Sequence, residues 1–347
     1  MASSGSSRRG ALVISLDFEL HWGVRDHMKA DGPYTRNLFG ARSAVPRMLK
    51  LFREFDVSAT WATVGFLFAR NRDELMDFSP SARPRYHNVQ LDPWREPIGR
   101  NEAEDPLHFA PSLLETIRAT DRQEIASHTF SHYYCLEPGQ DGAAFQADLA
   151  SARNIASATL GVNLRSLVLP RNQFNPDYAG VIQEAGFLCY RGNQSGSIHA
   201  ASDFESTSAL FRRAARLADA YLPLAPDCLP SWQHVSRGAP LCDVPASRYL
   251  RPWNQRLSVL DPLRAHRIVT GMRAAARNAR IYHLWWHPHN FGAHLDESIA
   301  FLSRILTEFR ALRDKFGFQS MSMAEAAETA CGAGADVPDP TPSHTAR

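Results

Sequence analysis

Short β-like runs alternate with longer helical runs along this chain, and this order limits the folds it can adopt more than any other feature. The predicted strands are six short apolar runs, at residues 11–16, 57–63, 123–127, 166–169, 187–190 and 281–286. The predicted helices have apolar residues at helical spacing and cover residues 43–55, 107–119, 143–160, 177–185, 262–279 and 295–316. Strands that alternate with helices form parallel sheets covered by helices. We therefore expect an α/β architecture.

The length of 347 residues fits two average domains, but it also fits one barrel with insertions. We expect one domain over residues 11–330, after a flexible N-terminus at residues 1–10. Residues 79–106 and 192–256 interrupt the alternation, because they are rich in proline and show no strong period. We interpret them as long loop insertions. Residues 331–347 are rich in Gly, Pro, Asp and Ser, which predicts a disordered tail.

Composition limits the compartment and the partners. No apolar run approaches the ~20 residues that a membrane helix needs. The start of the chain lacks the apolar core of a signal peptide, so we expect a cytoplasmic protein without a membrane span. The five cysteines are odd in number and form no CxxC pair, which favours free thiols. A net charge of +2 gives no indication of a nucleic-acid partner, and the sequence does not indicate the oligomeric state.

The most informative motif is HTFSH at residues 128–132. If this segment is one turn of helix, His128 and His132 lie on the same face and both imidazoles can reach one metal ion. Such a site needs a third ligand. Asp17 and Glu19 are candidates, since they directly follow the apolar run at residues 11–16.

Residues capable of chemistry follow several of the predicted strands. Asp17 and Glu19 follow the first strand, the histidine pair follows the third, and Arg171 follows the fourth. The late strand at residues 281–286 contains His283, and His287 and His289 follow it. Barrel enzymes collect their catalytic groups at the carboxyl ends of the strands. We therefore expect these distant segments to meet in one pocket.

Over roughly residues 11 to 291 these segments resemble the polysaccharide deacetylases, also called carbohydrate esterase family 4. HTFSH is similar to the metal-binding motif of the family in a shortened form. The family usually has two adjacent aspartates after its first strand, whereas here Phe18 separates Asp17 from Glu19. Arg171 is the residue that matches the arginine motif of the family, and His287 matches its late histidine motif. The resemblance implies a distorted (β/α)7 barrel.

The resemblance also implies a metal site made by Glu19, His128 and His132. Mixed imidazole and carboxylate ligands suit Zn²⁺, and Fe, Co, Ni or Mn would accept the same set. A divalent metal is therefore the expected cofactor, with Zn²⁺ first.

The implied roles of the remaining residues follow from the needs of amide hydrolysis, which are an activated water and a proton for the leaving amine. Asp17 would accept the proton of the water, and Arg171 would keep that carboxylate ionised. His287 would protonate the amine as it leaves. His283 and His289 are alternatives to His287 in this role.

Three functions are compatible with these residues. The first is a metal-dependent N-deacetylase acting on an N-acetylated sugar or glycoconjugate in polysaccharide or glycolipid biosynthesis. The second is hydrolysis of another non-peptide C–N bond, as in a formamide or an allantoin-like ureide. The third is a non-catalytic carbohydrate-binding protein on the same scaffold, although the presence of every expected site residue argues against it.

Each site residue also has a structural interpretation. A lone HxxxH pair is more often structural or exposed than a metal site. Asp17 could cap a turn, and Glu19 could be a solvated charge. We interpret His21 and His294 as ordinary polar positions. Four tryptophans near strands are interpreted as core residues rather than sugar-stacking ones, namely Trp22, Trp61, Trp285 and Trp286.

Overall fold

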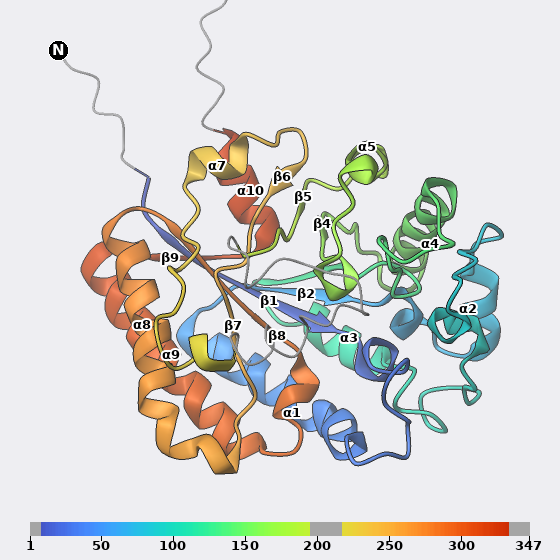
Figure 1. Cartoon of the computed structure of the whole chain (residues 1–347), viewed down its shortest axis with the longest axis horizontal. Helices are drawn as coiled ribbons and strands as arrows, with labels where there is room; N and C mark the ends of the chain where they lie inside the picture. Colours follow the sequence, from blue (N-terminus) through green and yellow to red (C-terminus); the bar gives the residue numbers. More distant parts are fainter. Residues whose placement is uncertain (1–7, 195–216, 333–347) are drawn as a thin grey trace, which may run out of the picture.

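The computed structural model describes residues 8–194 and 217–332. Within these residues one sheet contains nine strands, and every pair is parallel. In chain order the strands are β1 (Ala11–Phe18), β2 (Ala59–Thr63), β3 (Gln123–Ser127), β4 (Ser166–Leu167), β5 (Cys189–Tyr190), β6 (Cys242–Asp243), β7 (Arg248–Tyr249), β8 (Ile281–Trp286) and β9 (Gln319–Met321). Their spatial order is β6-β5-β4-β3-β2-β1-β8-β7, and β9 also pairs with β1. The expected α/β fold is confirmed as a curled parallel sheet, consistent with a distorted (β/α)7 barrel (Figure 1).

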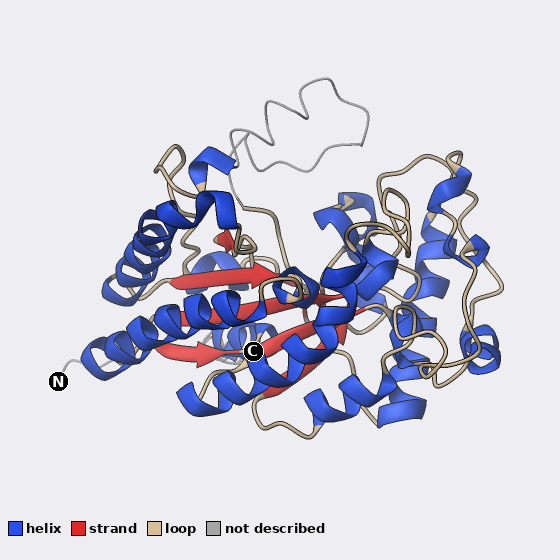
Figure 2. Ribbon diagram, turned by 90° about the horizontal axis from the view of Figure 1, so that it is seen from below, coloured by secondary structure: helices blue, strands red, loops and turns tan. Residues whose placement is uncertain are grey.

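Helices surround this sheet, as the view in Figure 2 shows. The α-helices are α1 (Thr35–Phe55), α2 (Arg72–Phe78), α3 (Pro111–Arg118), α4 (Gly142–Leu160), α5 (Ala179–Glu184), α7 (Trp232–Ser236), α8 (Asp261–Arg277), α9 (Leu295–Phe316) and α10 (Met323–Cys331). Helix α9 contacts both α8 and α1, and α1 contacts α3, so these four form a continuous outer layer. Helices α7 and α10 lie together apart from that layer (Figure 1).

Strand β1 is buried along its whole length, and its two faces pack against different helices. The even-numbered positions, such as Leu12 and Ile14, belong to the large core that includes the buried faces of α1 and α9. The odd-numbered positions Ala11 and Val13 pack in a second core with residues of α7 and α10. Side chains alternate along a strand, so the odd series continues through Ser15 and Asp17 on this inner face.

The inner face is closed at its amino end by α7 and α10. Trp232 and Val235 of α7, together with Met323 and Ala327 of α10, share a buried cluster with the first inner-face residues of the strands. These apolar side chains fill the amino half of the curled sheet. At this amino end the polar inner-face residues Thr60 and Glu124 hydrogen-bond to each other and to the first backbone N–H groups of α10, which leaves the carboxyl end for a site.

A close approach between two glycines places the segment after β8. A Cβ atom on Gly40 of α1 would lie 2.3 Å from the Cα atom of Gly292, so only glycine fits at this crossing. The contact brings α1 against the 3₁₀ turn η8 (Pro288–Phe291), which directly follows His287. The packing of α1 thus fixes the backbone that carries the late histidines.

Most predicted elements are present, and the differences have local causes. Helix α1 begins eight residues before the predicted start at residue 43, because Leu38 and Ala41 extend its buried stripe. The stretch at 192–256, interpreted as an insertion, supplies β6 and β7 to the two edges of the sheet. Both strands have only two residues and, unlike the equally short β4 and β5, they do not lie in a longer apolar run. Part of that stretch, residues 195–216, lies outside the described residues.

The last helix of the domain, α10, was not among the predicted helices. Helix α10 begins with a capping box in which Ser322 and Glu325 each accept from the backbone of the other. This Ser-x-x-Glu signature is readable in the sequence, and it marks the helix that closes the inner face. The expected tail lies outside the described residues from position 333 onward, as do residues 1–7 of the expected flexible start. All five cysteines are free, as expected.

Candidate active site

The polar side chains at the carboxyl ends of the strands are successive inner-face positions. On β1 the series Ser15, Asp17 and Glu19 leads out of the sheet, and on β8 the series His283 and His287 lies beside it. The alternation explains why the two acids are separated by one residue, since adjacent acids would point to opposite faces. The sheet therefore brings both acids to one point.

Glu19, His128 and His132 form a compact buried cluster. Oε2 of Glu19 lies 3.2 Å from Nε2 of His128 and 3.2 Å from Nε2 of His132. The Nδ1–H of His128 donates to the carbonyl oxygen of Val168 at 2.8 Å. This bond leaves the lone pair on Nε2, and that buried atom has no hydrogen-bond partner. A carboxylate oxygen and imidazole nitrogens facing one point fit a divalent metal.

The histidine segment is not helical, which corrects the helix expected at residues 128–132. The chain forms a loop there, and Thr129 and His132 have positive φ angles of 63° and 58°. Buried Asp148 of α4 holds the loop, because its carboxylate accepts from the backbone N–H of Phe130 at 2.6 Å and of Ser131 at 3.1 Å. The two rings thus meet through a fixed loop rather than through helical spacing.

Charge and burial fix the protonation states in this cluster. Burial alone would raise the pKa of Glu19, but His287, His128 and His132 together hold it well below the ordinary value. Burial lowers the pKa of His132 to about 4. The cluster therefore combines a carboxylate with a neutral imidazole, which are the forms that bind metal.

Asp17 is paired with Arg191, a residue that the sequence analysis did not identify. Nη1 of Arg191 donates to Oδ1 at 2.6 Å and Nη2 donates to Oδ2 at 2.8 Å, which is a bidentate pair. Burial alone would raise the pKa of Asp17, but the Arg191 guanidinium and His128 bring it below the ordinary value. Arg191 is itself buried, donates to Asn172 and Ser15, and lies over the ring of Trp285.

The position beside Asp17 that was expected for Arg171 is occupied by Arg191, which corrects the sequence-based partner of Asp17. Arg171 pairs with Asp26, approaches Glu137 at 3.7 Å and lies over the ring of Tyr134. Arg171 has a φ of 54° and lies in the 3₁₀ turn η5 (Pro170–Asn172), beyond the end of β4. Arg191 had a readable signal, since it is the next inner-face position after Cys189 of β5.

Among the late histidines, His287 lies closest to the acids. Its Nε2 is 3.4 Å from Oε1 of Glu19 and 3.8 Å from Oδ2 of Asp17, and its side chain is 22% exposed. His283 is fully buried between Ser15 and the carbonyl oxygen of Val244, and burial lowers its pKa to about 3. His289 is buried under the ring of His287, and burial also lowers its pKa to about 3.

Three of the four tryptophans near the strands have the core positions that were expected, and Trp285 does not. Trp22, Trp61 and Trp286 are at most 1% exposed and pack among other aromatic rings. Trp285 is only partly buried and supports the guanidinium of Arg191. His294, interpreted as an ordinary polar position, lies against the ring of Trp253.

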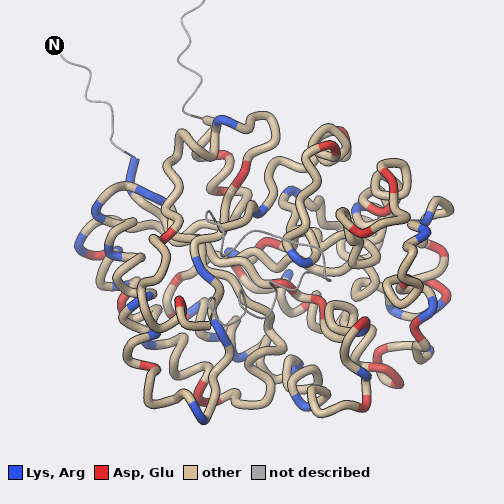
Figure 3. The backbone as a smooth tube through the Cα atoms, in the orientation of Figure 1, with Lys and Arg blue, Asp and Glu red and all other residues tan. Residues whose placement is uncertain are grey.

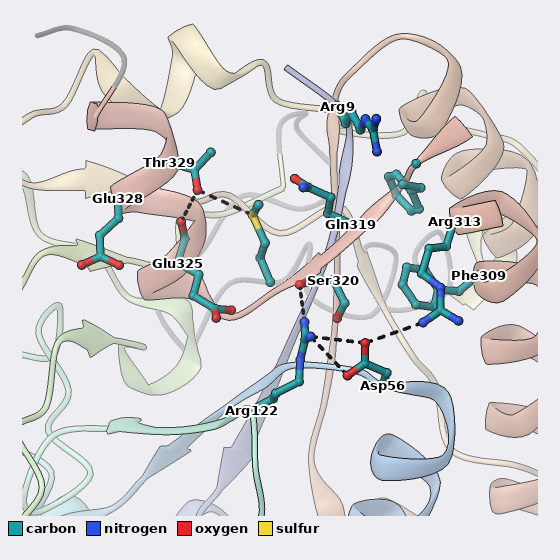
Figure 4. A pocket seen from close by; sticks show the side chains of 13 residues that line it. Arg9, Asp56, Arg122, Phe309, Arg313, Gln319, Ser320, Glu325, Glu328 and Thr329 are labelled. Atoms are coloured by element: carbon teal, nitrogen blue, oxygen red, sulfur yellow. Dashed lines mark hydrogen bonds and ion pairs between the residues drawn. The ribbon is translucent and has the colours of Figure 1, made fainter. Parts of the chain in front are cut away.

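A surface pocket of about 510 Å³ lies at the other end of the sheet (Figure 4). Arg9 precedes β1, Arg122 precedes β3 and Gln319 begins β9, so the pocket is at the amino ends of the strands. Within it, Asp56 pairs with Arg122 at 3.2 Å and with Arg313 at 3.8 Å. We therefore interpret it as a structural contact between loops.

Two properties of the whole molecule bear on its partners. Lysine, arginine and acidic residues are interspersed over the described backbone (Figure 3). Among the described residues, no helix is both long and apolar enough to cross a membrane.

Comparison with solved structures supports the fold. A crystal structure of a Mycobacterium smegmatis protein assigned to the polysaccharide deacetylases is 14% identical, with a TM-score of 0.60 over 99% of this chain and 98% of that chain. A Pseudomonas aeruginosa PAO1 protein with the same assignment is 12% identical, with a TM-score of 0.52 over 94% of this chain and 92% of that chain. At these identities the likeness concerns the fold. No curated protein matches the sequence.

The family model described as polysaccharide deacetylase matches residues 31–190. The matched segment includes the HTFSH loop and Arg171, whereas Asp17, Glu19, Arg191 and His287 lie outside it. The structure brings these outer residues to the matched histidines. The match indicates a hydrolase of the sugar N-deacetylase class, and over residues 31–190 the chain is similar to the polysaccharide deacetylase family.

Proposed function

We propose that this protein is a metal-dependent hydrolase that removes the N-acetyl group from a sugar or glycoconjugate. The reaction consumes water and an N-acetyl amide, and it yields acetate and a free amine. A substrate from polysaccharide or glycolipid biosynthesis, and a cytoplasmic location, stay sequence-based predictions.

Glu19, His128 and His132 would hold the metal. A set of two imidazoles and one carboxylate with open positions is typical of catalytic Zn²⁺, and Fe, Co, Ni or Mn are alternatives. A divalent ion in such a site supplies a Lewis acid that polarises a carbonyl and makes water more acidic.

Asp17 is the proposed general base. Its bidentate pair with Arg191 keeps the carboxylate ionised and fixes its orientation, while each carboxylate oxygen retains a further lone pair for a proton. Arg191 is a positioning residue in this account, because it acts through Asp17. Arg171, which the sequence predicted for this role, pairs with Asp26 instead of Asp17.

His287 is the proposed general acid. It is the partly exposed member of the late histidines, and its Nε2 faces both carboxylates. An imidazolium so placed can donate a proton to the departing amine. His283 and His289 are buried under other groups, which leaves them to support the pocket.

One observation carries the proposal. A bidentate Asp17–Arg191 pair and a Glu19–His128–His132 cluster lie side by side at the carboxyl end of the sheet, and the ring of His287 approaches both. Base, metal ligands and acid are the complete set that amide hydrolysis needs.

The direct test is a measurement of acetate released from a panel of N-acetylated sugars, free and lipid-linked, by protein of known metal content. We expect one acetate for each free amine formed, loss of activity with a chelator, and recovery when metal is restored. Formate release, or cleavage of a ureide without acetate, would show that the second candidate function is correct. Sugar binding without any turnover would show a non-catalytic protein.

A further inference from the structure

A second group of two histidines and a glutamate lies outside the proposed active site. Nδ1 of His21 and Nε2 of His108 are 2.9 Å apart. Oε1 of Glu96 lies 3.4 Å from the first nitrogen and 3.7 Å from the second. His21 and His108 are 1% and 3% exposed, so this cluster is buried on the imidazole side.

The other nitrogen of each ring is already committed as a donor. Nε2 of His21 lies 3.0 Å from the carbonyl oxygen of Met28, which can only accept. Nδ1 of His108 lies 2.8 Å from Oδ2 of Asp105, a carboxylate that also accepts from the backbone N–H of Gly99. With both outer nitrogens protonated, the two neutral rings direct lone pairs at one another.

Two lone pairs at this distance repel unless a cation lies between them. For the three separations given above, a point about 2 Å from all three ligand atoms exists, and this is the usual Zn–N and Zn–O bond length. Histidines that ligate metal commonly donate their other N–H to a carboxylate or a backbone carbonyl. Asp105 and Met28 occupy those two positions here.

The cluster joins parts of the chain that the sheet does not connect. His21 lies in the 3₁₀ turn η1 (Leu20–Gly23) after β1, Glu96 follows η4 (Pro93–Arg95), and His108 precedes α3. Glu96 lines two surface pockets of about 490 and 450 Å³, which provide a route for an ion.

We propose that His21, Glu96 and His108 form a second divalent-metal site. Zn²⁺ is the ion that best fits two imidazoles and one carboxylate. The ion ties the segment around residues 79–106 to the turn that directly follows Glu19. The indole of Trp22 packs on the ring of His108, and its Nε1–H donates to the His108 carbonyl oxygen. We assign the site a structural role, because Trp22 covers the ring of His108 and the outer nitrogens of both imidazoles are held by hydrogen bonds.

The test uses Co²⁺, whose visible absorption reports its ligands, on metal-free full-length protein. The His132→Ala background removes the cluster of the proposed function, so that absorption there reports the second site alone. We expect the His132→Ala variant to bind one Co²⁺ per chain, and the His132→Ala/His108→Ala variant to bind none. His132→Ala/His266→Ala, which changes an exposed histidine of α8, is the matched control and keeps the ion.

A Glu96→Gln change in the same background keeps the shape of a partly exposed side chain, and we expect it to weaken Co²⁺ binding at least tenfold. This variant remains informative if the His108 variant is unstable. Absence of Co²⁺ binding by the His132→Ala variant would overturn the proposal and leave a proton shared between the two rings. If instead the cluster of Glu19, His128 and His132 binds no metal, the wild type and the His132→Ala variant would each bind one Co²⁺. The experiment therefore separates an error in the proposed function from an error in this proposal.

Discussion

The two Glu–His–His clusters contain the same ligand types but have different surroundings. Glu19, His128 and His132 lie at the carboxyl end of the sheet, beside a paired acid and a partly exposed histidine. In the other cluster, the rings of His21 and His108 are enclosed by Trp22 and by backbone and carboxylate acceptors. The comparison teaches that similar ligand sets can serve chemistry or structure, and that the neighbouring acid and base decide which.

The largest difference between the clusters should appear when Asp17 is changed. In Asp17→Asn the proposed base is lost while the metal ligands stay, so kcat should fall by about 10³-fold. Metal content, measured by elemental analysis, should equal that of the wild type. The Asp105→Asn variant alters the acid beside the other cluster and should keep turnover. If Asp17→Asn turns over within tenfold of the wild type, Asp17 is not the base.

A smaller effect should separate His287 from its neighbour. Replacement of the proposed acid in His287→Ala should lower kcat by about 10²-fold with metal content unchanged. His289→Ala removes a ring that packs beneath His287 and should affect kcat less. Steady-state kinetics of the two variants compares them directly, and the reverse order would assign the acid role to His289.

The Asp17–Arg191 pair predicts a change in pH dependence. The Arg191→Lys variant loses the bidentate pair, so the pKa of Asp17 should rise because burial would no longer be fully opposed. A base with a higher pKa loses its charge at higher pH, so the acid limb of the kcat/KM profile should move upward. At neutral pH Asp17 stays ionised in this variant, so we expect a loss of about tenfold there from the lost orientation of the carboxylate alone.

Arg171→Lys is the matched control for this experiment, since Arg171 pairs with Asp26. Its profile should keep the acid limb of the wild type. An upward shift in Arg171→Lys without one in Arg191→Lys would restore the sequence-based partner of Asp17.

The smallest effect on activity is expected from Asp105→Asn. The amide is a weaker acceptor for Nδ1–H of His108, so Co²⁺ affinity at the second cluster should fall by about 10–100-fold. Acetate release should stay within twofold of the wild type. Unchanged Co²⁺ affinity would mean that Asp105 does not orient a metal ligand.

The sequence predicted those parts of the fold and of the site whose residues follow the regular period of a strand or a helix. Asp17 and Glu19 follow the strand period of two, and six of the nine strands have enough apolar residues to be predicted. His128 and His132 were identified by spacing, but the reason was wrong, because backbone with positive φ joins them instead of a helix. A positive φ angle at a single loop residue, as at Thr129 and His132, cannot be predicted from the composition of the segment.

The remaining residues depend on tertiary packing. Arg191 continues the inner-face alternation of β5, whereas Arg171 lies in a turn beyond β4, but only the packed sheet shows that Arg191 reaches Asp17. His21, Glu96 and His108 come from three loops, and their spacing forms no motif. His21 was therefore interpreted as an ordinary polar residue, although it is buried against His108.

The central claim, that only the cluster beside Asp17 is catalytic, is tested most directly by measuring acetate release and bound metal together in His132→Ala and His108→Ala. We predict one ion per chain in both variants, with acetate release within tenfold of wild type in His108→Ala and none detectable in His132→Ala. Equal activity of the two variants, or an active His132→Ala and an inactive His108→Ala, would contradict the account.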